Sequence, residues 1–524
     1  MSSSRARIVS RTLLLILLAG VAASRFYTRE QYITGLDPGN YLLGMKDFSI
    51  AAERPHPPGY PVYVALCRGV AAVTGDDHLA IIVVQILFSV LAVLFLYLLV
   101  ERKLGNRHAL LAAIFLAVNP LFWLYGATSE NYAFDAMIAP LVVLLLLSTR
   151  RWWWLATGLL FGIAAGMRST SLLLLAPVAL YILYSRYRRK ELIGADLLRL
   201  AGGALAGILA WLPATIVNEG GLAEYISAAT ALSMTAAGHF SGNLGGFVIT
   251  LLWMMNLSLL YLVSCSLRLV RTFGSGWRRA FRLSKILLLW ILPPLLFFAL
   301  VINAKGYMLL ILPGIALLLA WCLLRERSLA SKVIDSTLVV VAHLAFFILV
   351  PYLQPPEYIA LAPRQRTPEQ RALSVLGRAF SAFLPSYSRI RTLDHEVELA
   401  LRSTRFAVSD GGDSTLVVVD PSARQFVVAR VLQYYMPGVG FAEPSIRRDS
   451  VIVYYRGIGR QERRTPDSSF KAPRLLLMTD RRLADQYDET DLIPIISSPQ
   501  IAILEIRKGS ELKVRRKMEE MFVR

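Results

Sequence analysis

Apolar runs long enough to cross a membrane recur along the first two thirds of this sequence. Between Arg11 and Pro351 they are separated only by short polar segments, whereas residues 354–524 have the composition of a globular domain. A membrane-spanning helix needs about 20 mainly apolar residues. The runs that approach this length are 9–27, 79–100, 108–126, 132–149, 152–167, 169–185, 199–217, 245–267, 286–303, 307–324 and 333–353. The sequence therefore predicts a mostly α-helical protein, a polytopic membrane bundle of about 11 spans followed by a C-terminal α/β domain.

The composition excludes a purely soluble enzyme. Hydrophobic residues make up 55% of the chain and charged residues 18%, against roughly 45–50% and 25% in an average soluble protein. The formal net charge is +20. Most of this surplus lies in short loops between apolar runs and not on a soluble face with interleaved aromatics, so no nucleic-acid partner is expected. Residues 354–524 contain no cysteine, which excludes a disulfide framework there.

Loop charge predicts an orientation for the runs. With the N-terminus in the cytoplasm and the runs threaded alternately, the inner segments hold 22 Lys and Arg residues and the outer segments hold seven. Cytoplasmic loops carry the excess of Lys and Arg, so the C-terminal domain is expected to be extracytoplasmic. We expect the first run, which follows Arg5, Arg7 and Arg11, to be an uncleaved anchor and not a signal peptide. No retention signal ends the chain, so we expect a bacterial or archaeal plasma membrane.

Two parts follow from this organisation. Residues 1–353 form the membrane part, with a long first outer loop at 25–74, and residues 354–524 form the extracytoplasmic domain. In the second part, residues 414–420, 451–455, 474–478 and 501–506 have the pattern of strands, and residues 423–435 and 481–487 that of helices. In the first part, Gly158, Gly162 and Gly166 recur at a spacing that lets two helices approach closely.

The first outer loop is rich in glycine and proline. Pro57, Pro58 and Pro61 can begin a helix but cannot lie inside one without breaking it. We therefore expect residues 60–73 to form a short amphipathic helix at the membrane surface and not a span.

Polar residues that the topology places at the outer face are the candidate functional residues, because membrane helices otherwise hide polar groups. Three acidic and three basic residues converge there: Asp37, Glu130, Asp135, Arg68, Arg168 and Lys305. A carboxylate can act as general base on an acceptor hydroxyl, or hold a divalent cation such as Mg²⁺ or Mn²⁺ that does so. Cations in the same place can stabilise the charge that develops on a phosphate leaving group. A cavity with both signs suits a substrate that has a phosphate and a reacting hydroxyl.

Each of these residues also has a purely structural interpretation. Asp37, Glu130 and Asp135 can act as a turn former, a helix cap and an ion-pair partner, respectively. The three basic side chains can extend to the membrane interface, and His56 can order the proline-rich turn. His78 is isolated in the sequence, which argues against a histidine metal site.

Several segments of the outer face match a known pattern. Gly35-Leu36-Asp37 places an acid in the first outer loop, residues 56–63 read HPPGYPVY, and residues 129–132 read Ser-Glu-x-Tyr. A weaker feature is Lys305-Gly306-Tyr307 followed by Pro313. In these features the chain resembles the polytopic, lipid-sugar-dependent glycosyltransferases of the C-type superfamily, especially the protein O-mannosyltransferase-like branch. The resemblance covers roughly residues 10–325.

This resemblance implies a polyprenyl- or dolichyl-phosphate sugar donor, transfer on the outer face and inversion at the anomeric carbon. It implies that Asp37 is the catalytic base, and we expect Glu130 to position the acceptor or a metal ion. The acceptor is a hydroxyl of a glycan, a lipid or a protein. The residues expected to bind substrate are His56, Tyr60, Arg68, Asp135, Arg168, Lys305 and Tyr307, with Arg68 and Lys305 against the donor phosphate.

Two other classes of protein stay open at this point. One is a lipid-glycan flippase or transporter, and the other is a catalytically silent assembly subunit that keeps the fold. Transporters commonly contain internal repeats and helices broken at corresponding places. The sequence contains no convincing repeat, and its long first outer loop and globular C-terminal part argue against transport.

Overall fold

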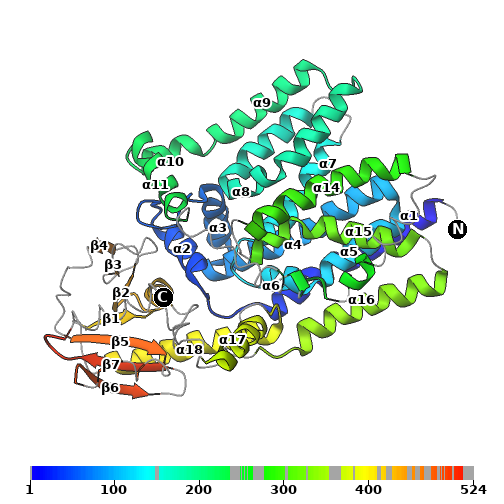
Figure 1. Cartoon of the computed structure of the whole chain (residues 1–524). Coiled ribbons are helices and arrows are strands. Elements are labelled where there is room, and N and C mark those ends of the chain that lie inside the picture. Colours follow the sequence, from blue (N-terminus) through cyan, green and yellow to red (C-terminus); the bar gives the residue numbers. More distant parts are fainter. Residues whose placement is uncertain are drawn as a thin grey trace.

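The computed structural model describes most of the membrane part and a smaller share of the C-terminal part. The described residues are 3–147, 153–236, 248, 251–252, 254–256, 258–263, 277–300, 305–325, 328–352, 367–381, 384–409, 415–420, 428–444, 451–454, 461–464, 474–480, 484, 487–488, 490–497 and 501–510. A helical bundle carries a β-sheet at one end, and the N-terminus lies at the other end (Figure 1).

The predicted apolar runs coincide with helices wherever they are described, and the run at 245–267 is described only in short pieces. The helices are α1 (Ser3–Thr28), α2 (Leu36–Lys46), α3 (Pro61–Thr74), α4 (Asp77–Leu104), α5 (Asn106–Val118), α6 (Pro120–Gly126), α7 (Ala133–Leu146), α8 (Trp153–Arg188), α9 (Gly194–Leu209), α10 (Leu212–Asn218), α11 (Leu222–Ala236), α14 (Trp277–Leu300), the short 3₁₀ helix η2 (Lys305–Leu310), α15 (Leu312–Arg325) and α16 (Leu329–Leu349). Among the described helices, five are long and apolar enough to cross a membrane, or six if the bent pair α5 and α6 is one span. The exact number of spans stays a prediction.

The predicted run at 108–126 is broken in the middle. Helices α5 and α6 meet at an angle of 65°. The break follows from the sequence, because Pro120 has no amide hydrogen to continue a helix. The side chain of Asn119 instead accepts hydrogen bonds from the amides of Leu121 and Phe122 and begins α6 as a new helix.

Helix α8 turns back on itself at Arg168, as the two predicted runs at 152–167 and 169–185 require. Arg168 has φ −162° and ψ 88°, outside the helical region. The Arg186 guanidinium lies 5.1 Å from the centre of the Trp154 ring. A straight helix would separate two residues 32 positions apart by about 48 Å. The two halves of α8 therefore run antiparallel, and Arg168 occupies the turn between them.

Glycines bring α9 close to the first half of α8. A Cβ atom at Gly158 would lie 2.0 Å from the carbonyl oxygen of Leu200, and one at Gly203 would lie 2.2 Å from that of Leu155. Only a hydrogen fits at either place. The predicted close approach of two helices at the glycine repeat is confirmed at Gly158.

The first outer loop contains two helices. Helix α2 follows Gly35, whose φ of 97° suits only glycine well. Helix α3 begins with Pro61, directly after Tyr60, which has φ 47°. The predicted helix at 60–73 is confirmed as α3, and its place at the membrane surface stays a prediction.

The C-terminal part is a mixed sheet with helices. Its helices are α17 (Pro368–Ser381), α18 (Tyr387–Ser409) and α19 (Ala429–Tyr435), and its strands are β1 (Thr415–Val419), β2 (Gly440–Pro444), β3 (Val451–Tyr454), β4 (Gln461–Arg464), β5 (Arg474–Asp480), β6 (Leu492–Ser497) and β7 (Ile501–Ile506). The strand order is β4-β3-β2-β1-β5-β7-β6. Strand β1 pairs in parallel with β2 and β5, and the outer pairs are antiparallel.

The four predicted strands are confirmed as β1, β3, β5 and β7. The predicted helix at 423–435 is confirmed for the part that forms α19. The helix expected at 481–487 lies mostly outside the described residues.

Candidate active site

Asp37 lies in the first turn of α2, at the end of the bundle that faces the sheet. Its Oδ1 atom is 3.5 Å from Nδ1 of His56, and 37% of its side chain is exposed. His56 is buried and comes from the HPPGYPVY segment. The structure therefore brings together two residues that the sequence selects separately, a buried imidazole and a carboxylate open to a ligand.

Aromatic rings surround His56. The ring centres of Tyr60 and Tyr41 lie 5.0 Å and 5.7 Å from that of His56, and those two tyrosines are 5.5 Å apart in an edge-to-face arrangement. Tyr63 packs on Tyr41 at 4.9 Å. Edge-to-face packing fixes ring orientation, so this cluster holds the imidazole rigidly beside Asp37.

Glu130 lies in the turn between α6 and α7, opposite the start of α2. A Cβ atom at Gly35 would be 3.8 Å from Glu130 Oε1. Burial, together with the neighbouring carboxylates of Asp37 and Glu30, raises the pKa of Glu130 to about 8. A carboxyl with such a pKa exchanges a proton near neutral pH, which suits acid–base work or a hydrogen bond to a substrate hydroxyl.

Arg168, at the turn of α8, is buried between charged and aromatic groups. Its Nε atom is 3.1 Å from Oδ2 of Asp135, and its NH1 group donates a hydrogen bond to Oδ1 of Asn131. The guanidinium lies 4.3 Å from the centre of the Tyr132 ring and 4.6 Å from that of Tyr307. Two cation–π contacts and an ion pair hold the positive charge in one place. The structure thus brings together three of the predicted substrate-binding residues, Arg168, Asp135 and Tyr307, which are called the Arg168 unit below.

The other two predicted cations are placed differently. Arg68 lies on α3, where its Nε and NH2 groups donate hydrogen bonds to the carbonyl oxygens of Met45 and Gly44, both at 2.8 Å. These bonds satisfy the C-terminal carbonyls of α2 and attach α3 to it. Lys305 begins η2, and its side chain lies outside the described part of the chain. Phosphate binding by Arg68 and Lys305 stays a prediction.

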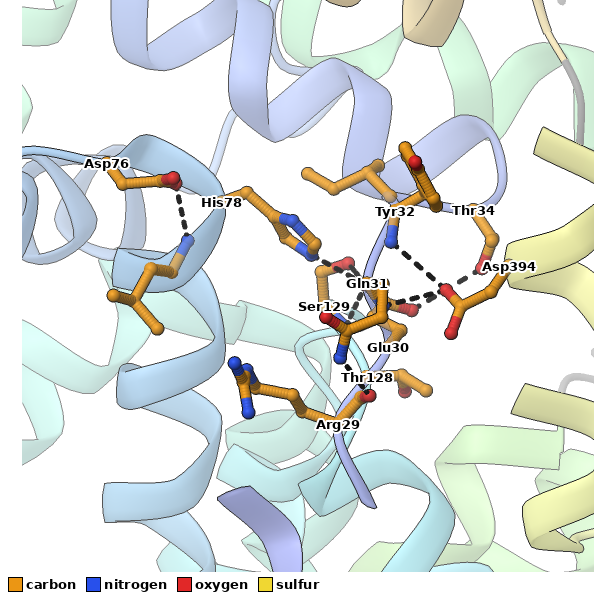
Figure 2. Close-up of polar contacts among 12 residues, drawn as sticks. Arg29, Glu30, Gln31, Tyr32, Thr34, Asp76, His78, Thr128, Ser129 and Asp394 are labelled. Carbon is orange, nitrogen blue, oxygen red and sulfur yellow. Dashed lines mark hydrogen bonds and ion pairs between the residues drawn. The ribbon is translucent and has the colours of Figure 1, made fainter. Parts of the chain in front are cut away.

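Glu30 is a site residue that sequence reasoning missed (Figure 2). It follows α1 and is almost fully buried. Its Oε1 atom accepts hydrogen bonds from the amide and the hydroxyl of Ser129 and lies 3.4 Å from Nε2 of His78. Glu30 therefore fixes the turn that carries Glu130. His78 is not isolated in space, although it is in the sequence.

The C-terminal part contacts the same segment. Oδ1 of Asp394, on α18, accepts hydrogen bonds from the amides of Gln31 and Tyr32 at 2.7 Å and 3.0 Å (Figure 2). The amide of Ile33 donates to the hydroxyl of Tyr435, on α19, at 3.0 Å. The backbone that leads from α1 to Asp37 is thus held by two helices that lie more than 350 residues later in the chain.

A metal site does not follow from the described side chains. Among the residues that the structure describes, no group of three or more His, Cys, Asp or Glu side chains is arranged to hold a metal ion. Binding of a divalent cation by the carboxylates near Asp37 stays a prediction.

The long apolar helices define a class of protein, the multi-pass membrane proteins, and the residues described above form a candidate site at one end of the bundle. Residues 55–216 match a family model described as dolichyl-phosphate-mannose-protein mannosyltransferase. This segment contains the HPPGYPVY stretch, Glu130 and Arg168, whereas Asp37 precedes it. The resemblance inferred from the sequence is thereby confirmed.

Two solved structures have the same fold over nearly the whole chain. ArnT from Cupriavidus metallidurans bound to undecaprenyl phosphate is 13% identical, with a TM-score of 0.60, and the match covers 94% of this chain and 98% of that one. The apo state of ArnT from the same organism is 13% identical, with a TM-score of 0.56 and coverage of 95% and 98%. A comparison with curated protein sequences gives no match.

Proposed function

We propose that this chain is an integral membrane glycosyltransferase that transfers a sugar from a polyprenyl-phosphate-linked donor to an acceptor hydroxyl. The observation that carries the proposal is the meeting of Asp37, Glu130 and the Arg168 unit at the end of the bundle nearest the sheet. The match of residues 55–216 to a lipid-phosphate-sugar family and the fold of ArnT, which was solved with undecaprenyl phosphate, support a lipid-phosphate donor.

The proposed reaction is a single displacement. Asp37 takes the proton of the acceptor hydroxyl as that oxygen attacks C1 of the donor sugar. The bond from C1 to the phosphate oxygen breaks on the opposite side, so the anomeric configuration inverts and the polyprenyl phosphate leaves as an anion. The lipid tail keeps this leaving group in the bilayer.

Glu130 and the cations complete the proposed site. Glu130 accepts a hydrogen bond from the acceptor substrate or donates one to it, because its raised pKa makes both protonation states accessible near neutral pH. Arg68 and Lys305 bind the donor phosphate, with Tyr307 assisting. Arg168, held by Asp135 and two tyrosines, supplies a fixed positive charge near the phosphate.

The proposed location is a plasma membrane, with the N-terminus in the cytoplasm and the sheet outside. The excess of Lys and Arg in the predicted inner loops supports this orientation. The sheet and the N-terminus lie at opposite ends of the bundle, which is consistent with it (Figure 1). The acceptor is a glycan, a lipid or a protein.

The test is a transfer assay on purified protein with a panel of radiolabelled polyprenyl-phosphate sugars. Asp37→Asn is compared with Asp47→Asn, which removes the next acid of the same loop, an exposed group paired with Arg54 at 2.8 Å. We expect one donor to be turned over, with turnover reduced on the order of 10²-fold or more by Asp37→Asn and unchanged by Asp47→Asn. Running the assay with and without a chelator decides metal dependence.

The alternative classes predict other results. Unchanged turnover in Asp37→Asn contradicts the assignment of the base. Binding of the lipid without turnover of any donor would instead favour a flippase or a silent assembly subunit. Movement of a labelled lipid across vesicles that contain the protein would separate these two.

A further inference from the structure

A chain of buried polar side chains connects the C-terminal part to Asp37. The NH1 group of Arg430, on α19, donates a hydrogen bond to Oδ1 of Asn40, on α2. The amide nitrogen of Asn40 lies 3.3 Å from Nδ1 of His56, and this same Nδ1 atom lies 3.5 Å from Oδ1 of Asp37. Arg430 is 1% exposed and Asn40 is fully buried, so water does not compete for these contacts.

Arg430 is anchored firmly enough to fix the orientation of Asn40. Its Nε group donates to Oε1 of Glu443, on β2, at 2.7 Å, and its NH2 group lies 3.6 Å from Oε2 of Glu53 in the first outer loop. Its aliphatic stem crosses α2 at Gly39, where a Cβ atom would lie 2.9 Å from Arg430 Cγ. The guanidinium therefore has one position, set by two carboxylates and by a helix face without a side chain.

The direction of each hydrogen bond follows from this anchor. A guanidinium has donors only, so the oxygen of the Asn40 amide must face it and the amide NH₂ group must face His56. The NH₂ group is also only a donor, so Nδ1 of His56 must accept. The imidazole is then neutral, with its proton on Nε2 and with Nδ1 as an acceptor for Asn40, 3.5 Å from Oδ1 of Asp37.

The surroundings of His56 agree with a neutral ring. Burial lowers the pKa of His56, and the positive charges of Arg430 and Arg168 lower it as well. The carboxylates of Asp37 and Glu53 act in the opposite direction but do not outweigh burial.

We propose that Arg430 is a positioning residue that acts through Asn40 to hold His56 as the neutral Nε2–H tautomer, with Nδ1 as an acceptor that lies within reach of both Asn40 and Asp37. The proposal rests on the proposed function of Asp37 as the base. When Oδ1 of Asp37 takes the proton of the acceptor hydroxyl, the new O–H group shares the single Nδ1 lone pair of His56 with the Asn40 amide in a three-centre hydrogen bond. The ionised Asp37 cannot make this bond, so it forms only in the state that the reaction creates. The C-terminal part thereby takes part in the reaction without touching the substrate.

The tautomer is measured directly by ¹⁵N NMR on protein labelled at histidine, in which His56→Gln identifies the His56 signals among the six histidines. We expect wild-type His56 to carry its proton on Nε2. Asn40→Asp keeps an acceptor for Arg430 but places a second acceptor against Nδ1, so we expect the proton to move to Nδ1. Arg474→Met is the matched control in the same part of the chain, since Arg474, on β5, pairs with Glu505, on β7, at 3.3 Å. We expect it to leave the signals unchanged.

Kinetics provide the second readout. We expect Asn40→Asp to lower kcat on the order of 10²-fold, with little change in KM for the lipid donor and a shifted pH profile. Arg430→Met is expected to lower kcat similarly, and Arg430→Lys, which still donates to Asn40, is expected to restore part of it. A merely structural role would lower the amount of folded protein and leave kcat and the pH profile of the folded fraction unchanged.

The two proposals fail in different ways. The proposed role of Arg430 is overturned, even if transfer is observed, by either of two NMR results. One is a proton on Nδ1 of wild-type His56, and the other is a tautomer that Asn40→Asp does not change. Unchanged kcat in both Asn40→Asp and Arg430→Met also overturns this role. If Asp37→Asn keeps full activity while the tautomer is as described, the proposed function of Asp37 is wrong, and the role of Arg430 in the reaction is wrong with it.

Discussion

The guanidinium of Arg168 lies against the carboxylate of Asp135, with Nε 3.1 Å from Oδ2, at the turn where α8 reverses direction. Both side chains are buried. The hydroxyl of Ser171 donates to Oδ1 of Asp135, so the pair joins α7 to the turn and the second half of α8. It explains how an arginine can occupy the end of two apolar segments.

Breaking this pair should destabilise the protein strongly. Asp135→Asn leaves the buried guanidinium without its counter-charge, a loss of roughly 3–5 kcal/mol in comparable buried pairs. We expect a clearly lower midpoint of thermal unfolding in detergent, followed by size-exclusion chromatography. Arg402→Gln, which removes an exposed ion pair with Glu398, should change the midpoint little. Equal midpoints for the two variants would contradict a structural role of the Arg168–Asp135 pair.

The raised pKa of Glu130 predicts how stability depends on pH. The ordinary pKa of a glutamate is 4.5, and that of Glu130 in the folded protein is about 8. Between these two pH values the carboxyl of Glu130 is ionised in the unfolded chain but protonated in the folded chain, so its contribution to stability falls as the pH rises. Glu130→Gln removes this pH-dependent loss of stability. We expect the variant to gain thermal stability over wild type at pH 9 and to show little difference at pH 4.5. A gain that is the same at both pH values would exclude Glu130 as the titrating group.

The same carboxyl should also be visible in activity. If Glu130 must be in one protonation state to hold the acceptor, the wild-type profile of kcat/KM against pH should contain a step near 8. Glu130→Gln should remove that step. Its persistence in the variant would assign the step to another group.

Two neighbouring glycines of α9 test the contact with α8. A Cβ atom at Gly203 would lie 2.2 Å from the carbonyl oxygen of Leu155, whereas one at Gly202 meets nothing within 4 Å. Gly203→Ala should therefore separate the helices at a loss of about 1–3 kcal/mol. Gly202→Ala should be neutral or stabilise by up to about 1 kcal/mol. Equal midpoints of thermal unfolding for the two variants would contradict the close contact between α9 and α8.

Most of the membrane helices could be predicted because the length of an apolar run can be read from the sequence. In lipid, a single span must form a helix to hydrogen-bond its own backbone groups. Helix α3 could be predicted because Pro61 and the preceding prolines fix where it begins. The break between α5 and α6 has the same kind of cause, because Pro120 has no amide hydrogen to continue a helix.

The C-terminal part was harder to predict. Strand β4 reads QERR and carries no apolar alternation, and β6 contains Pro494. Their places come from pairing with neighbouring strands, which one sequence does not reveal. The partners of the candidate site residues were also hidden, because Arg430 meets Asn40 across 390 positions of the chain. Local spacing selects residue types, whereas only the folded chain shows that His56 faces Asp37 and that Arg168 is already paired.

The hydrogen bonds of Asp394 and Tyr435 to the backbone of residues 31–33 determine when in synthesis the candidate site can form. The backbone that leads to Asp37 leaves the ribosome early, but its hydrogen-bond partners are synthesised 363 and 402 residues later. These contacts therefore form only after the C-terminal part has been made and has reached the same side of the membrane. A chain whose synthesis stalls before α19 lacks them, so the assembled site marks a polypeptide that has been made at least as far as Tyr435.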